Sequence, residues 1–233
     1  MIGFDRPIRP RWIYDTLLLA EPGQKLSELN KPFEGIANEL TGKEGKRKAR
    51  TVLFRCFLRD EDHSSRVKKN LILKDLSLKH GFDFMVPIYL FYLVGRTSVL
   101  YKISDHLFRL YGFGVTINKN FLKDKLVNLF GDRDVVARSV RSFLKTLVYF
   151  DVAQGTKIIY LKRPLKVDEE QISLMIKTFS KEIIRTPQIA LNDLPKTIFN
   201  FFEIPELREV AQKMNGKYWE YQQRTGSDFL IVY

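Results

Sequence analysis

The stretch that most constrains the fold is residues 134–149, DVVARSVRSFLKTLVY. Apolar side chains recur in it at spacings of three and four, which marks one buried face of a helix. These apolar positions are Val136, Val140, Phe143, Leu144 and Leu147. Arg138, Arg141 and Lys145 repeat the same spacing on the opposite side. The pattern therefore predicts a helix with a buried apolar face and a basic outer face.

The residues that follow predict a small basic hairpin. A turn at Gly155-Thr156 leads into the alternating strand 157–161, which ends in Lys162 and Arg163. A basic helix followed by a basic hairpin is the layout of a winged helix-turn-helix. In such a domain the helix enters a DNA major groove and the hairpin, or wing, contacts the neighbouring phosphates. The alternative is an ordinary surface helix and hairpin whose charges are solvated.

The residues before the basic helix complete this layout. Asn118 or Asn120 can cap a helix that runs to Phe130, and Gly131-Asp132 then forms the tight turn, with Asp132 placed to cap the next helix. Residues 115–164 therefore resemble a winged-helix DNA-binding domain. Residues 138–152, a basic helix that leads into a short apolar strand, also resemble BrxA-type accessory proteins of BREX phage-defence systems. Both resemblances imply DNA binding, and the second implies no catalytic activity.

Charge is distributed unevenly along the chain. The 233 residues carry a formal net charge of +12. Residues 1–167 contain 31 basic and 17 acidic side chains, net +14, whereas residues 168–233 contain 8 and 10, net −2. The imbalance favours a polyanionic partner in the first two thirds, with nucleic acid ahead of an acidic membrane surface. We expect the acidic last third to be a structural module or to bind a protein partner.

A second basic helix is predicted over residues 43–59, which hold seven basic side chains and one acid, Glu44. Like charges at this density repel each other unless a polyanion compensates them. Lys46, Arg47 and Arg50 are therefore candidate phosphate contacts, and a solvated basic face is the alternative. The extended leader 6–11 adds three arginines, either as an arm in a groove or, as we favour, packed on the surface.

Known catalytic and metal-binding patterns are missing from the sequence. Gly45-Lys46 is followed by Arg47, which is not a P-loop, and one Cys with three scattered His does not match a zinc site. The single Cys56 is expected to be a buried apolar residue. The longest apolar run, residues 84–94, is shorter than the roughly 20 residues that cross a bilayer, and no secretory signal opens the chain. We expect a soluble cytoplasmic protein without cofactor, metal or catalytic residue.

These observations predict a mainly α-helical, multi-helix bundle with one or two winged-helix-type units. The expected parts are a basic helical domain (1–114), a winged-helix-like domain (115–167), and a helical segment with a terminal hairpin (168–233). The expected function is binding of double-stranded DNA. An RNA-binding protein, an assembly subunit that meets an acidic protein, and an enzyme with an unrecognised site are the alternatives. The expected phosphate contacts are Lys46, Arg47, Arg50, Lys162 and Arg163, and those expected to reach base edges are Arg138, Arg141 and Lys145.

Overall fold

The computed structural model describes residues 3–60, 64–224 and 226–233. Its architecture is mainly helical, as predicted, with 58% helix and small sheets of few strands. In chain order the elements are α1 (Pro10–Leu19), η1 (Leu26–Leu29), α2 (Asn30–Ile36), α3 (Lys43–Phe57), α4 (Ile72–His80), α5 (Phe82–Arg96), α6 (Ser98–Leu110), α7 (Lys119–Phe130), α8 (Asp134–Tyr149), β1 (Ala153–Gly155), β2 (Ile159–Leu161), β3 (Leu165–Lys166), α9 (Glu169–Thr178), η2 (Phe179–Ile184), β4 (Gln188–Ala190), η3 (Leu191–Asp193), α10 (Lys196–Phe199), β5 (Phe202–Glu203), α11 (Leu207–Lys213), β6 (Trp219–Arg224) and β7 (Ser227–Val232).

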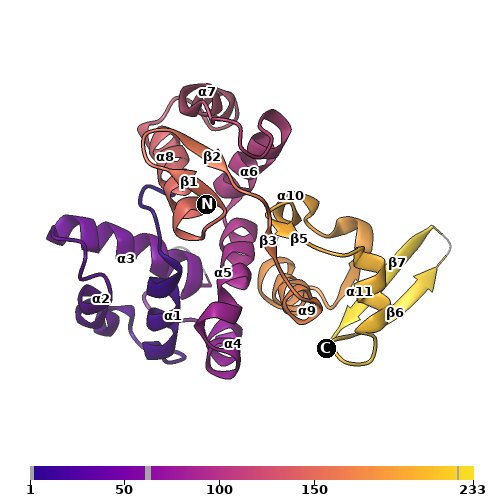
Figure 1. Ribbon diagram of the computed structural model, residues 1–233. Helices are drawn as coiled ribbons and strands as arrows, with labels where there is room; N and C mark the ends of the chain where they lie inside the picture. Colours follow the sequence, from indigo (N-terminus) through magenta and orange to yellow (C-terminus); the bar gives the residue numbers. More distant parts are fainter. Residues whose placement is uncertain (1–2, 61–63, 225) are drawn as a thin grey trace.

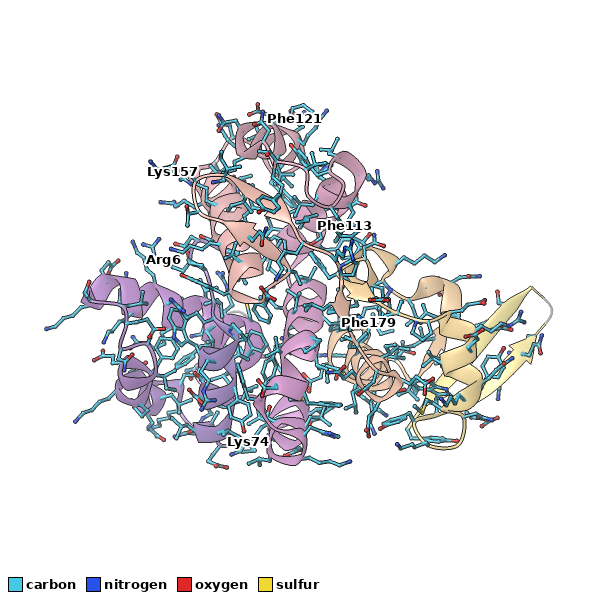
Figure 2. All side chains as sticks on the ribbon, viewed as in Figure 1. Arg6, Lys74, Phe113, Phe121, Lys157 and Phe179 are labelled. Atoms are coloured by element: carbon cyan, nitrogen blue, oxygen red, sulfur yellow. The ribbon has the colours of Figure 1, made fainter. Side chains whose placement is uncertain are left out.

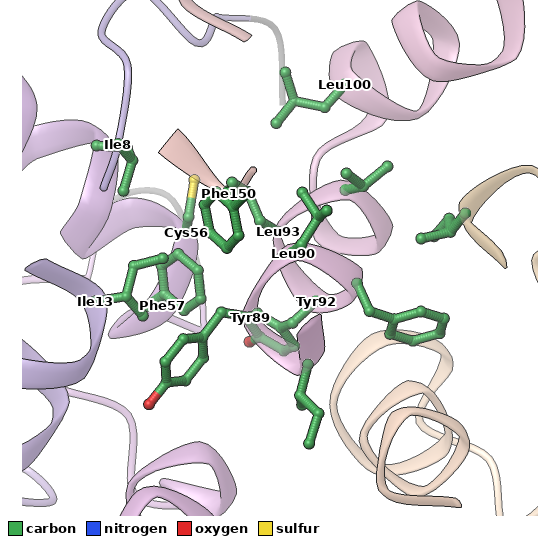
Figure 3. Close-up of a cluster of buried hydrophobic side chains, with 14 of the residues drawn as sticks. Ile8, Ile13, Cys56, Phe57, Tyr89, Leu90, Tyr92, Leu93, Leu100 and Phe150 are labelled. Carbon is green, nitrogen blue, oxygen red and sulfur yellow. The ribbon is translucent and has the colours of Figure 1, made fainter. Parts of the chain in front are cut away.

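Helix α5 is the centre of the molecule. Figure 1 shows it between the N-terminal helices on one side and α9 and α10 on the other. All its residues from Pro87 to Val94 are buried, as expected of a helix that is apolar on every side. Figure 3 shows the residues of α5 beside Cys56 and Phe57 of α3, and the Phe57 ring lies 5.4 Å from that of Tyr92. Burial of each such large apolar side chain stabilises the fold by about 1.5–3 kcal/mol.

Polar contacts join the N-terminal part of the chain to the C-terminal third. Lys68 and Glu182 form a buried ion pair, and the Lys68 ammonium also donates to the Tyr92 hydroxyl at 3.1 Å. Desolvation lowers the pKa of Lys68, and Glu182 opposes that shift. Arg96 donates to the Glu182 carbonyl oxygen at 3.3 Å and to that of Arg59 at 2.7 Å. Buried side chains of all three predicted parts belong to one hydrophobic cluster, and their division into domains stays a prediction.

Helices α6, α7 and α8 pack together and carry the β1–β2 hairpin. The hairpin is antiparallel, and Gly155 in its turn has φ +106°. A Cβ at Gly155 would lie 1.9 Å from the Ile158 carbonyl oxygen, so only glycine fits there. Gly114 and Ile117 donate to the carbonyl oxygens of Leu161 and Ile159 at 2.8 and 2.9 Å. The chain before α7 therefore lies along β2 as an additional extended segment.

The C-terminal third begins with a capping box at Asp168 and Gln171 of α9 and ends with the predicted hairpin, β6–β7. The short strand β4 pairs with β7, which gives a three-stranded sheet in the order β4-β7-β6. Across the described residues no single helix is long and apolar enough to cross a membrane; α5 and α6 meet that test only as a pair bent by 105°.

Candidate nucleic-acid interface

Helix α8 presents the predicted basic face to solvent. Its observed bounds, Asp134–Tyr149, are those expected from the apolar period, and Val136, Val140 and Leu144 are buried. Arg138, Arg141 and Lys145 are all exposed on the opposite side. In the part of the chain that the structure describes, none of these three cations is ion-paired with a carboxylate. The face is therefore free to meet an external anion.

The turn before α8 forms in a different way from the prediction. Asn118 caps α7, because its side chain accepts from the N–H groups of Asn120 and Phe121. Gly131 ends α7 with φ +78°. The N-cap of α8 is Arg133, with no side-chain hydrogen bond, so the predicted capping by Asp132 is wrong. The tight connection between the two helices is nevertheless present.

The leader, which in the structure comprises residues 3–9 before α1, packs along α8 instead of extending away as an arm. Phe4 N–H donates to Ser139 Oγ at 2.8 Å, and Ile8 N–H donates to Thr146 Oγ1 at 3.0 Å. Phe4 and Ile8 are fully buried, and the Phe4 ring meets Phe143 edge-on at 6.4 Å. These contacts hold both ends of the leader against the side of α8 that adjoins the basic face. The interpretation of the leader as a packed segment is therefore confirmed.

The leader adds two arginines beside α8. The Arg9 guanidinium lies 4.2 Å from the centre of the Tyr149 ring, and the Lys145 ammonium lies 5.8 Å from the same ring. Arg9 is also paired with Glu39 at 3.1 Å. Among the described residues, the Arg6 side chain donates to the neighbouring Asp5 carbonyl oxygen at 3.0 Å. In the view of Figure 2, Arg6 lies between α3 and the hairpin that carries Lys157. Arg6 and Arg9 belong to the leader that was expected either as an arm in a groove or as a packed segment, and neither was a predicted contact residue.

The hairpin supplies a smaller group of cations. Lys157 and Arg163 are exposed, and Lys162 is paired with Asp151 at 2.6 Å. Lys119 of α7 donates to the Lys157 carbonyl oxygen at 2.7 Å, which fixes the hairpin tip against the start of α7. Of the two predicted hairpin contacts, Arg163 is therefore available to a phosphate. Lys162 must first break its ion pair with Asp151. Lys157 was not predicted.

The predicted contacts on α3 already have partners within the protein. Lys46 donates to the Glu34 carbonyl oxygen at 3.0 Å. Arg50 points to the same flank, where it donates to the Asn30 carbonyl oxygen at 3.4 Å. Arg47 makes two hydrogen bonds to the Glu44 carboxylate, at 2.9 and 2.8 Å. Lys46 and Arg50 therefore face α2, and α3 does not present the three residues as one free surface.

Glu44 partly neutralises the solvent face of α3. It also pairs with Lys48 at 3.1 Å. Hydrogen bonds from Arg47 and Lys48 lower the pKa of the Glu44 carboxyl to about 2, so the carboxylate is charged at neutral pH. Further along the same helix, Arg55 donates to the Gly3 carbonyl oxygen of the leader. The α3 surface is less positive than its composition indicates.

The described residues contain no group of three or more His, Cys, Asp or Glu side chains that could hold a metal ion. Cys56 is buried, as expected, with its sulfur 3.8 Å from Thr97 Oγ1. No family model, curated protein or solved structure matches this chain. Inferences about function therefore depend on the geometry of its own residues.

Proposed function

We propose that this protein binds double-stranded DNA, with the outer face of α8 in the major groove and the β1–β2 hairpin on the neighbouring phosphates. The observation that carries the proposal is the row formed by Arg138, Arg141 and Lys145, exposed on one side of α8 with no carboxylate partner among the described residues. From Arg138 to Lys145 the helix rises about 10 Å, close to the roughly 12 Å width of the major groove. The row therefore suits contact with two or three successive base pairs.

The local architecture supports this orientation. Helix α7, the turn, α8 and the hairpin occur in the order expected of a winged-helix domain, and α7 packs against α8. The leader and α6 cover other flanks of α8, which leaves the basic flank exposed. A helix held on several sides presents its side chains rigidly, and rigid presentation favours specific recognition over loose attraction.

Each cation has a role in the proposed complex. Arg138 and Arg141 can each donate two hydrogen bonds to one guanine edge, whereas Lys145 acts as a point charge. Exposed Lys157 and Arg163 are proposed to contact phosphates, and Lys162 to join them by exchanging Asp151 for a phosphate oxygen. The predicted α3 contacts Lys46, Arg47 and Arg50 are assigned a secondary role, because each has an internal partner.

The C-terminal third is proposed to be structural. Several of its acids are used internally: Glu169 pairs with Lys213 at 2.6 Å, and Asp228 pairs with Arg208 at 2.9 Å. The proposed role is non-catalytic and cytoplasmic, as a regulator or as the accessory factor in phage defence that the resemblance to BrxA-type proteins implies. Binding of a protein partner to the remaining acidic side chains of this third is compatible with this role.

A fluorescence-anisotropy titration of the full chain with a labelled duplex tests the proposal. If six cations meet phosphates, log affinity falls against log salt with a slope of about −5. Arg138→Gln/Arg141→Gln should weaken binding at least tenfold. The control Lys181→Gln/Lys196→Gln removes the same charge from exposed residues of the acidic third and should leave affinity within about threefold. Absence of binding at low salt contradicts the proposal, and stronger competition by structured RNA than by duplex DNA favours the RNA alternative.

A further inference from the structure

A pocket of about 680 Å³ lies where the end of α6 meets the C-terminal third of the chain. One part of its lining comes from residues 108–113 and from Pro164, which lies between β2 and β3. The other part comes from α10, β5 and the start of α11. In the view of Figure 2, Phe113 lies at this boundary. The volume is in the range of small-ligand pockets, about 300–1,000 Å³.

The lining of the pocket is mainly aromatic. Its aromatic residues come from both parts of the lining, and they are Phe108, Tyr111, Phe113, Phe199 and Phe202. Aromatic side chains contact a further ring favourably, either edge-on or in an offset stack. The lining therefore favours a ligand that contains a planar aromatic ring over a sugar or another polar molecule.

Contacts behind the lining hold its rings in place. The Phe108 ring meets that of Phe201 edge-on at 4.8 Å, and the Phe199 ring lies 5.2 Å from that of Phe91 in α5. Leu165 N–H donates to the Phe201 carbonyl oxygen at 2.9 Å, which holds the chain before β3 beside β5. The pocket is therefore formed before a ligand enters, so that binding requires little ordering of the protein.

Phe113 is the aromatic residue at the rim. Its side chain is 50% exposed. The backbone beside it is fixed, because Gly114 N–H donates to the Leu161 carbonyl oxygen at 2.8 Å. A ring that binds in the pocket would cover part of this apolar surface, and removal of apolar surface from water favours binding.

The polar side chains of the pocket are Lys196, Asn200 and Glu203, and all three are exposed. None of them makes an ion pair or a side-chain hydrogen bond within the described part of the chain. Lys196 attracts a carboxylate, Glu203 attracts an ammonium group, and the Asn200 amide can hydrogen-bond to either. A ligand with only one charge meets a like charge at this rim, whereas a ligand with both charges is complementary to it.

We propose that this pocket binds a small aromatic molecule that carries both an ammonium and a carboxylate group, the chemistry of an aromatic amino acid. The ring lies among the aromatic side chains, and the charged head meets Lys196 and Glu203 at the rim. None of the residues proposed to contact DNA lines the pocket. The inference is independent of the proposed function.

Isothermal titration calorimetry of the full chain with tryptophan tests the site. Tryptamine and indole-3-propionate carry the same ring with only the ammonium or only the carboxylate, and alanine carries the charged head without the ring. We expect tryptophan to bind at one site, the two indole probes to bind about threefold more weakly, and alanine not to bind.

Substitutions at the rim locate the bound probe. Phe113→Ala should weaken tryptophan binding by about fivefold. The matched control is Phe121→Ala, because Phe121 is 43% exposed on α7, outside the pocket. Lys196→Gln should weaken the binding of tryptophan but not that of tryptamine, whereas Lys181→Gln, at an exposed position outside the pocket, should change neither. Circular dichroism confirms that each variant is folded.

Three results would overturn the proposal. The first is no binding of tryptophan to the unaltered protein at millimolar concentration. The second is equal tryptophan affinity in Phe113→Ala and Phe121→Ala. The third is binding of tryptamine or indole-3-propionate as tight as that of tryptophan, since the rim would then not recognise both charges. These titrations contain no DNA, so a failure of the duplex-binding proposal leaves their result unchanged.

Discussion

The backbone N–H of Phe4 donates a hydrogen bond to Ser139 Oγ at 2.8 Å, across 135 positions of sequence. Ser139 in turn donates to the Val135 carbonyl oxygen of its own helix at 2.8 Å. Because Ser139 is adjacent to Arg138 in α8, the bond anchors the leader next to the proposed DNA-binding face. The position of the basic row therefore depends on the first residues of the chain as well as on α8.

Ser139→Ala tests this anchor. The substitution leaves the buried Phe4 N–H without an acceptor, and we expect the free energy of unfolding to fall by about 1–3 kcal/mol in urea denaturation. Ser104→Ala is a matched control: Ser104 is equally buried and bonds the carbonyl oxygen four residues before it, at 2.8 Å. Its hydroxyl receives no backbone N–H from another described segment, so the loss should be smaller. Equal losses would show that the leader contact contributes nothing.

Removal of one member of the Lys68–Glu182 pair should be strongly destabilising. Lys68→Met leaves the buried Glu182 carboxylate without its cationic partner, and we expect a loss of about 3–5 kcal/mol in the free energy of unfolding. The double variant Lys68→Met/Glu182→Met removes both charges and should recover part of that loss. Chemical denaturation of the two variants measures the difference. A double variant that is less stable than the single variant contradicts the assignment of the pair.

The hydrogen bond from Tyr218 to Glu170, 2.8 Å long, should make stability depend on pH. It lowers the pKa of Glu170, so its stabilising effect is present above the usual carboxyl pKa of 4.5 and is lost as pH falls. Tyr218→Phe should reduce the free energy of unfolding by up to about 1 kcal/mol at pH 7, because Glu170 is partly exposed, and by less at pH 3. Tyr233→Phe, at an exposed position, is the control. If Tyr218→Phe costs as much stability at pH 3 as at pH 7, the Glu170 carboxylate is not the cause of the loss.

Gly155→Ala should distort the hairpin. Its Cβ would collide with the Ile158 carbonyl oxygen, and its φ of +106° strains any other residue. We expect a loss of about 1–3 kcal/mol in stability and faster hydrogen exchange in residues 153–161. Gly45→Ala, in the first turn of α3 where a Cβ meets nothing within 4 Å, should instead stabilise the protein by about 0.4–1 kcal/mol. If hydrogen exchange in residues 153–161 is unchanged in Gly155→Ala, the turn does not require glycine at this position.

Elements with strong local patterns were predictable from the sequence. The spacing of apolar residues in 134–149 predicted α8. The terminal hairpin was also predicted, and the cap of α7 was narrowed to two asparagines, of which Asn118 is the one observed. These features depend on residues within a few positions of each other. The candidate interface was predictable to the same extent, because a helical period places Arg138, Arg141 and Lys145 on one side.

Long-range packing was not predictable. The spacing of apolar residues in α3 identifies its buried side but not the flank that α2 covers. Lys46 and Arg50 could therefore not be recognised as residues that face α2. Similarly, the pairing of Ile117 with β2 and of β4 with β7 has no local signal. Phe4 and Ile8 gave only a weak sign, because they are isolated apolar residues that follow no helical or strand period.

The most direct test compares duplex affinity in Arg138→Glu/Arg141→Glu with that in Lys46→Glu/Arg50→Glu at one salt concentration, with circular dichroism to confirm folding. Both variants reverse two charges, so the change in net charge is the same. We predict a loss of at least a hundredfold for the α8 variant and a loss about tenfold smaller for the α3 variant. An α8 variant that binds as well as the unaltered protein, or an α3 variant with the larger loss, would contradict the assignment of DNA binding to α8.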